Sequence, residues 1–391
     1  MNYLYHKKQS LQFTKIAFLG LVALSSALSV KAQESKTVKT HLGLIYPLST
    51  NGTHAPLDTN NFSVHLLVGI SSVEKGSAFA GLSNVVRNEA KGVLFAGFSN
   101  HVGRKSNGAL FAGFLNTYRT AQGSQFAGFA NLAAGTVKGA QFSGFLNLAG
   151  GDMQGVQLAG FANVAKNLKG TQLAGFSNTA QNVSQSQFAG FINVAKEVKG
   201  SQFSGFINVA KKVKGTQIAG FINIADSSDC PIGIINIIKN GEKSIAVTID
   251  ESQTSMLTFR SGGKHLYGII GAGYNIKNKD EVYAFEAGLG GHFFQTKYFR
   301  LNMELTQTIL ESFEAGEYFK GTLRFLPAFK VVPWLEIFGG PSINFVSTNT
   351  VEGFALHPEN EKLVIHTWQN NWSDFRQSLH VGYQAGLQIV F

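Results

Sequence analysis

The sequence predicts an all-β protein in which a β-solenoid of 15–16-residue coils is attached to a small, about eight-stranded transmembrane β-barrel. Three observations support this fold class: a motif repeated ten times, two-residue alternation of apolar residues in the C-terminal third, and an N-terminal stretch typical of secretion. A period of 15–16 residues is too short for helix-pair repeats or propeller blades. We therefore expect each copy to form one coil of a stacked β-structure.

The chain divides into four segments by composition and pattern. We expect a signal peptide at residues 1–32, one or two strands at 33–72 that belong to the barrel or cap the solenoid, the solenoid at 73–240, and the barrel at 241–391. After the first segment, no stretch approaches the roughly 20 apolar residues of a spanning helix. A mature chain that crosses a membrane therefore has to do so as a closed barrel.

The first segment has the three parts of a secretory signal peptide. Lys7, Lys8 and Lys15 precede the apolar run 16–24, and Val30-Lys31-Ala32 supplies small residues at the cleavage positions. We expect cleavage before Gln33 and no lipoprotein anchor, because no cysteine follows the cut. An uncleaved membrane helix is the alternative, which the short apolar run disfavours.

Two short strands precede the repeats, at 41–48 and 62–70. In each, apolar residues alternate with smaller or polar ones, as expected for a strand with one buried face. The loop between them contains Asn51-Gly52 and Pro56, which favour turns. Either strand can belong to the barrel or to the end of the solenoid.

The repeat reads Gln-Φ-Ala-Gly-Phe-x-Asn-Val-Ala, where Φ is apolar, and its clearest copies are 202–210 and 217–225. The apolar residue lies two positions before the glycine, and a Phe follows the glycine in nine of the ten copies. These two columns have opposite parity in a strand. We expect a corner at the glycine that lets both columns turn inward, with Phe stacked on Phe inside the solenoid.

An asparagine occupies the third position after the glycine in all ten copies. Identical amides one strand spacing apart can hydrogen-bond along the stack, so we expect a structural ladder in preference to a row of ligand-binding residues. The ladder residues are Asn84, Asn100, Asn116, Asn131, Asn147, Asn163, Asn178, Asn193, Asn208 and Asn223.

Two further columns are candidates for a working surface. The Gln before the apolar position appears only from Gln125 onward, and we expect this column on an exposed face. Lysines such as Lys196, Lys199, Lys211 and Lys214 gather in the linking half of each copy. They favour a solvated edge protected from aggregation, with a stripe that attracts anionic glycan or lipid phosphate as the alternative.

The last strand carries the strongest barrel signal. From Leu379 to Phe391, apolar residues alternate with mostly polar ones, and the chain ends on an aromatic residue. This pattern resembles the C-terminal assembly signal of bacterial outer-membrane barrels. The resemblance implies that the residues of this membrane assembly signal are Tyr383, Leu387, Ile389 and Phe391.

Catalytic and cofactor motifs are absent from the sequence, so we expect no enzyme, no metal and no cofactor. Glu286, Glu304, Arg324 and Glu336 have lumen parity in the barrel, where salt bridges that fill the interior are far commoner than acid–base pairs. The single Cys230 has no nearby His and acid pattern and reads as a packed residue.

Charge also limits the partners. Removal of the signal peptide lowers the net charge from +10 to about +6. Dispersed lysines without a recognition motif make nucleic acid a poor partner. Outer-membrane lipid, and a glycan or a cell-surface protein, are the partners that we expect. In the long loop 347–377, an aromatic group that includes His357, His366, Trp368 and Trp372 can bind sugar or protein, or pack on the barrel rim.

The repeated unit, with the signal peptide and the barrel-like end, resembles the surface-repeat outer-membrane protein family of the Leptospira and Bacteroidetes type. The resemblance covers the mature chain and is specific in the repeats. It implies exposure at the cell surface and brings no catalytic residues. Display, adhesion or binding by a barrel-anchored solenoid is therefore the first functional hypothesis, and an envelope channel or transporter component, with the repeats as plug or periplasmic extension, is the second.

Strand count decides where the solenoid lies. If both early strands join the barrel, six later strands complete eight and the solenoid is periplasmic or plugs the lumen. If only one joins, and 244–259 is a single strand that closes through Ser261-Gly262-Gly263, the count is again eight and the solenoid lies outside. The second arrangement is favoured, because the tight turn before Lys264 suits a periplasmic hairpin. A third version, with the repeats as barrel strands, would present one motif in two opposite directions.

Overall fold

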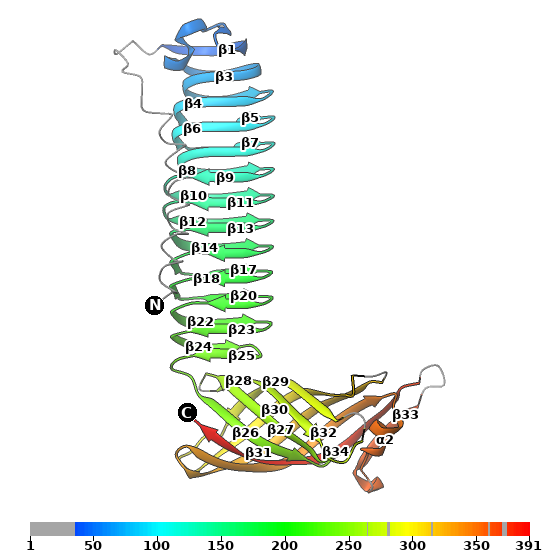
Figure 1. Ribbon diagram of the computed structural model, residues 1–391. Helices are drawn as coiled ribbons and strands as arrows, with labels where there is room; N and C mark the ends of the chain where they lie inside the picture. The colour runs from blue at the N-terminus through cyan, green and yellow to red at the C-terminus, as the bar shows by residue number, and fades with distance from the viewer. Residues whose placement is uncertain (1–35, 264, 280–281, 314–315, 359, 370–373) are drawn as a thin grey trace, which may run out of the picture.

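The protein consists of a long β-solenoid and a β-barrel attached to its last coil (Figure 1). The computed structural model describes residues 36–391 apart from 264, 280–281, 314–315, 359 and 370–373. The expected signal peptide lies outside the described residues. The solenoid has about 11 coils and the barrel is closed by eight antiparallel strands, so the expected fold class is confirmed.

The solenoid is built from short strands that pair in parallel with the same strand of the next coil. For example, Gln157 pairs with Gln172, and Asn163 pairs with Asn178. The strands are β1 (Thr37–Ile45), β2 (Leu48–Ser49), β3 (Thr59–Ala80), β4 (Ser83–Ala90), β5 (Leu94–Ala96), β6 (Ser99–Ser106), β7 (Leu110–Ala112), β8 (Leu115–Ala127), β9 (Ala130–Ala133), β10 (Val137–Ser143), β11 (Leu146–Ala149), β12 (Met153–Ala159), β13 (Ala162–Ala165), β14 (Asn167–Ala174), β15 (Ser177–Thr179), β16 (Asn182–Val183), β17 (Ser186–Ala189), β18 (Ile192–Val194), β19 (Glu197–Val198), β20 (Ser201–Ser204), β21 (Ile207–Val209), β22 (Lys212–Ala219), β23 (Ile222–Ala225), β24 (Ser227–Ile232) and β25 (Ile235–Ile238).

The motif glycine forms the corner of each coil and lies directly above the glycine of the coil before. A Cβ atom added at Gly175 would lie 2.1 Å from the carbonyl oxygen of Gly160, and at Gly190 it would lie 2.1 Å from that of Gly175. Atoms cannot approach this closely, so any side chain at the corner would push the coils apart. The corner therefore requires glycine because of the close approach between coils.

The asparagine column is fully buried and links every coil to the next. Each Asn Nδ2 donates to the Oδ1 of the next Asn in the column at 2.9–3.0 Å, from Asn84 to Asn236. The same nitrogen also donates to a backbone carbonyl beside the corner of the following coil. Asn178, for example, donates to the oxygen of Phe188 at 2.6 Å. The column therefore satisfies backbone acceptors that the sharp corner removes from the β-ladder.

The glutamine column is also buried, which contradicts the expectation of an exposed face. Gln157, Gln172 and Gln187 are each 0% exposed. From Gln157 to Gln217, each Gln donates to the preceding Gln at 2.6–3.0 Å. The strand before the corner thus turns its Gln inward and the following apolar residue outward.

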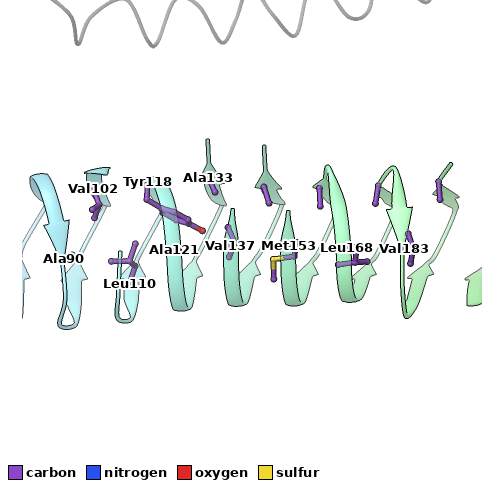
Figure 2. Close-up of a cluster of buried hydrophobic side chains, with 14 of the residues drawn as sticks. Ala90, Val102, Leu110, Tyr118, Ala121, Ala133, Val137, Met153, Leu168 and Val183 are labelled. Atoms are coloured by element: carbon purple, nitrogen blue, oxygen red, sulfur yellow. The ribbon is translucent and has the colours of Figure 1, made fainter. Parts of the chain in front are cut away.

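That reversal also overturns the prediction that Phe stacks inside the solenoid. The Phe columns do stack, but on the outer surface, where Phe161 is 41% exposed and Phe188 is 38% exposed. The interior instead contains small and aliphatic side chains such as Ala133, Val137, Met153 and Leu168 (Figure 2). The buried amide columns lie there as well. A 15-residue coil encloses too little space for two rings per turn in addition to its amides.

Both early strands belong to the solenoid, where they cap its first coil. β1 pairs in parallel with β3, and η2 (Gly52–Leu57) lies between them in the chain. The favoured arrangement, in which one of these strands enters the barrel, is therefore wrong. Apolar and polar residues do alternate in these early strands. A strand that caps a solenoid has one covered face, however, and shows the same alternation as a barrel strand.

The barrel consists of eight strands, and β26 pairs with β34 to close it. The stretch 244–259, expected as one strand, is a hairpin of two. The strands of this sheet are β26 (Lys243–Asp250), β27 (Thr254–Gly262), β28 (Leu266–Asn275), β29 (Tyr283–Phe293), β30 (Phe299–Glu311), β31 (Tyr318–Val332), β32 (Leu335–Thr348), β33 (Val364–Gln369) and β34 (Arg376–Val390). α2 (Val351–Ala355) and η3 (Glu361–Leu363) lie in the long connection before β33, which pairs only with β34.

Substitution of one ladder asparagine should destabilise the solenoid. We expect Asn178→Ala to lower the free energy of unfolding by about 2–5 kcal/mol, because it leaves buried groups of Asn163, Asn193 and Phe188 without partners. Urea titration followed by circular dichroism measures this change. Thr179→Ala, at the exposed neighbouring position, is the control and should change stability by less than about 0.5 kcal/mol. Equal losses in both variants would contradict a structural role for the ladder.

Candidate functional site

The most prominent surface feature is a pair of aromatic columns that flank the corner along the solenoid. We call the two columns together the aromatic edge. The column before the glycine contains Phe79, Phe95, Phe111, Phe126, Phe142, Leu158, Leu173, Phe188, Phe203 and Ile218. The column after it contains Phe98, Phe114, Phe129, Phe145, Phe161, Phe176, Phe191, Phe206 and Phe221.

Rings of successive coils stack face to face at the spacing of the coils. Centroids lie 4.8–5.2 Å apart in the column from Phe98 to Phe221, and the rings of Phe161 and Phe176 are within 2° of parallel. An open apolar groove runs between the first column and the glycines. Its N-terminal part has a volume of about 670 Å³ and is lined by residues such as Phe95, Ala96 and Gly97. Thirteen side chains of the edge are 37–50% exposed. A contiguous apolar surface of this kind marks an interaction site.

Charge is separated from the aromatic edge. In all ten copies, no Lys, Arg, Asp or Glu occurs from three residues before the corner glycine to five after it. The exposed lysines, among them Lys169, Lys199 and Lys214, follow in the linking half of the coil. The solenoid is therefore amphipathic around its own axis, with an apolar edge and a cationic one.

The barrel interior is filled by a network of paired charges. Arg260 donates to Glu304 at 2.8 Å, and Arg324 bridges Glu286 and Glu304. Arg300 and Glu336 form a further pair at 2.8 Å, so all four residues that the sequence assigned to the lumen lie in buried ion pairs. Each of these side chains is at most 4% exposed, and they cross the space that a pore would need.

A second charged group lies nearer the long-loop end of the barrel. Lys320 Nζ lies 2.9 Å from Asp250 and 2.6 Å from Glu251, and Glu251 also accepts a bond from Asn344. Sequence reasoning missed these residues, because Asp250 and Glu251 were expected inside one continuous strand. They lie at the turn between β26 and β27, and their carboxylates reach back to Lys320.

The solenoid cap contains a histidine cluster that superficially resembles a catalytic triad. Ser49 Oγ lies 3.0 Å from His41 Nε2, and Asn60 Nδ2 lies 3.2 Å from His41 Nδ1 and 3.0 Å from Glu74. Because the Asn60 nitrogen donates to both groups, His41 Nδ1 is an acceptor and Nε2 carries the proton. That tautomer cannot take a proton from Ser49, so the cluster fits a structural role.

Among the described residues of the long loop, His357 has different contacts from His366 and Trp368. His357 turns toward the barrel, where its Nδ1 lies 3.1 Å from Ser378 Oγ, whereas His366 packs against Trp368 on β33. Trp372 lies outside the described residues. The packing of His357 favours a role at the barrel rim over a joint ligand site.

The four residues of the expected assembly signal all point away from the barrel interior. Tyr383, Leu387, Ile389 and Phe391 are 50–63% exposed on the outer face of the closing strand. Their inward neighbours Gln384 and Gln388 are buried. The last strand is thus two-faced, as its alternation predicted.

Comparisons with family models, curated proteins and solved structures give no match for this chain. Within the described part of the chain, no helix is long and apolar enough to span a membrane. Among the same residues, no group of three His, Cys, Asp or Glu side chains is arranged to hold a metal ion. Function therefore has to be argued from the geometry of the solenoid and the barrel.

Removal of one carboxylate from the barrel network should be costly. We expect Glu304→Gln to lower the free energy of unfolding by about 3–5 kcal/mol, because Arg260 and Arg324 lose a buried counter-charge. Urea unfolding in detergent, followed by the gel mobility of the folded barrel, measures it. Leu305→Met, on the outward-facing neighbour, is the control, and a loss no larger than in that control would contradict the network's importance.

The solenoid cap should loosen in acid. Burial lowers the pKa of His65 to about 4, with a smaller contribution from the charge of His41, and burial also lowers the pKa of His41. Below the unfolded value of about 6.5, the unfolded chain binds protons that the folded cap excludes, so cap stability falls as the pH falls toward 4. Burial also raises the pKa of Glu74, which makes the folded cap more stable as the pH falls. This one carboxyl opposes the effect of the two histidines.

Hydrogen exchange of β1 and the first part of β3 checks this expectation. Protection should decrease between about pH 7 and pH 4.5 in these strands, after correction for the intrinsic exchange rate, and should stay constant in β12 and β13. His65→Gln should flatten the pH dependence of the cap. Unchanged protection of the cap in the unmodified protein would contradict the burial of neutral histidines.

Proposed function

We propose that the protein is a non-enzymatic outer-membrane protein of a Gram-negative cell, in which the barrel anchors a solenoid that serves as a binding surface. The observation that carries this proposal is the two-faced barrel wall. Outward side chains such as Val247, Leu257, Leu305 and Leu387 are apolar and 52–64% exposed, while the alternate positions turn inward and are mostly polar. Lipid is the covering that suits such a wall around a closed barrel.

Aromatic residues at both ends of the wall support the same proposal. Tyr298, Trp334 and Phe391 are exposed near the ends where the turns are short. Tyr274 and Tyr283 are exposed near the opposite end. Such pairs of aromatic belts are typical of barrels that span a membrane, because Trp and Tyr favour the lipid–water interface.

Strand count favours a periplasmic solenoid. All eight barrel strands follow the repeats, so the first and last barrel residues, Lys243 and Phe391, lie at the same end. That end has the short turns 263–265, 294–298 and 333–334, whereas the other end has the connection 349–375. In outer-membrane barrels the short turns face the periplasm. The expectation of surface exposure rested on one early strand in the barrel and on the family resemblance, and the strand count removes the first of these grounds.

The filled lumen argues against a channel as the second function. Arg260, Arg300 and Arg324 are paired across the interior, and they would have to move with their glutamates to open a path. Surface display or adhesion, with a glycan or cell-surface protein as partner, would instead require the solenoid to lie outside. Localisation therefore separates the remaining possibilities.

Tag accessibility on intact cells tests the proposal. A tag inserted at the exposed Lys212 of the solenoid should be labelled by antibody only after the outer membrane is opened, whereas a tag at Lys362 in the long connection should be labelled on intact cells. Labelling of Lys212 on intact cells would reverse the orientation and support display or adhesion. Recovery of the untagged protein in the soluble fraction would overturn the membrane anchor itself.

A further inference from the structure

The junction between the two parts determines how the solenoid lies relative to a membrane. The last coil packs against the outer wall of the barrel and not against its open end. The backbone nitrogen of Asn236 donates to Ser261 Oγ at 2.9 Å, and Asn236 Nδ2 donates to the Ser261 carbonyl at 3.0 Å. On the paired strand, the outward side of Gly268 is covered, since a Cβ there would lie 2.1 Å from the carbonyl oxygens of Gly233 and Ile234.

A rod whose end rests on the side wall of a barrel extends away from that wall. Figure 1 shows the solenoid running across the barrel's long direction, from the wall near β27 and β28. If the barrel axis follows the membrane normal, the solenoid therefore runs along the membrane plane. It lies on the periplasmic side but does not extend away from the membrane.

The contact lies next to the apolar belt. Ser261 is two residues from Phe259 on β27, and Gly268 is two residues from Ile270 on β28. Both Phe259 and Ile270 line an apolar hollow on the lipid-facing wall, together with Leu257. Two strand residues span about 7 Å, and less along the axis of a tilted strand. The base of the solenoid is thus within one side-chain length of the lipid-facing wall.

The aromatic edge lies on the side of the solenoid that faces along the barrel wall. In Figure 1, the corners that end β5, β17 and β20 lie on the side of the solenoid toward which the barrel extends, with α2 and β33 at its far end. The corner of the last coil, Gly233-Ile234, is the one that touches the barrel wall at Gly268. The linking half of each coil, which carries the lysines where they occur, lies on the opposite side (Figure 1).

We propose that the aromatic edge is a lipid-binding surface, which holds the solenoid flat on the leaflet from which the short barrel turns emerge. The inference rests on the proposed membrane function. Phe columns at interfacial depth would bury rings that are now about 40% exposed, and the absence of charge near the corner removes the penalty for entering the interface. An apolar edge and a cationic edge on one element are the features of an interfacial amphipathic structure.

Continuity with the belt favours lipid over a soluble partner. The column after the glycine keeps Phe and a ring spacing of 4.8–5.2 Å from Phe98 to Phe221, and the column before it is apolar throughout, which suits a planar and chemically uniform surface. A folded protein partner would be expected to select particular coils. The barrel end of the edge also lies next to the wall residues Phe259 and Ile270, which lipid covers in the proposed function.

Site-specific fluorescence in vesicles tests this inference. With Cys230→Ser as background, single cysteines at Phe161→Cys on the edge, Lys169→Cys in the lysine half of the same coil, and Leu257→Cys on the barrel wall carry an environment-sensitive dye. The full chain is reconstituted in vesicles of phosphatidylethanolamine with phosphatidylglycerol, and quenching by aqueous iodide and by spin-labelled lipid is compared. Phe176→Cys provides a second edge position if the first variant fails to fold.

We expect the label at Phe161 to be quenched by spin-labelled lipid and to be at least about fivefold less sensitive to iodide than the label at Lys169. Equal iodide sensitivity at Phe161 and Lys169, with lipid quenching at Leu257, would overturn the inference and leave the membrane anchor intact. Protection from iodide without lipid quenching at Phe161 would also overturn it, and would indicate coverage by a second copy. Absence of lipid quenching at Leu257 would mean that the proposed function itself fails.

Discussion

The buried asparagine column is the interaction on which the rest of the solenoid depends. Each amide bonds to the next amide and to a backbone carbonyl beside the corner, so every coil has to repeat at one height and in one register. A single displaced coil would leave several buried groups without partners, which is far more costly than the loss of one surface contact. The corner glycines follow from this constraint, because coils held this close leave no room for a Cβ.

The same constraint produces the aromatic edge. With Gln turned inward before the corner, strand alternation sends the next residue outward, and the residue after the glycine lies outward at the corner itself. Those residues are mostly Phe, and the fixed coil spacing stacks them at 4.8–5.2 Å. The buried amide columns and the apolar edge are thus two results of one register. The stacking offsets part of the cost of exposure, and lipid contact would offset more.

The barrel follows a different physical logic, with its charges enclosed and its apolar residues outside. Arg260, Arg324 and their glutamates can be buried because each is paired in several directions. With eight strands the wall encloses little more than these side chains. The barrel is thus suited to hold and orient the solenoid, and its outer wall at Ser261 and Gly268 supplies the platform.

The sequence was enough to predict the coil period, the asparagine column and the alternating faces of the closing strand, because repetition and alternation act between neighbours in the chain. It did not determine which side of the corner faces inward, so the burial of Phe161 and the exposure of Gln172 were both predicted wrongly. Nor did it assign the early strands, because β1 alternates in the same way in a cap or a barrel. These points depend on the three-dimensional packing, since inside and outside are set by how a coil closes and by what covers each face.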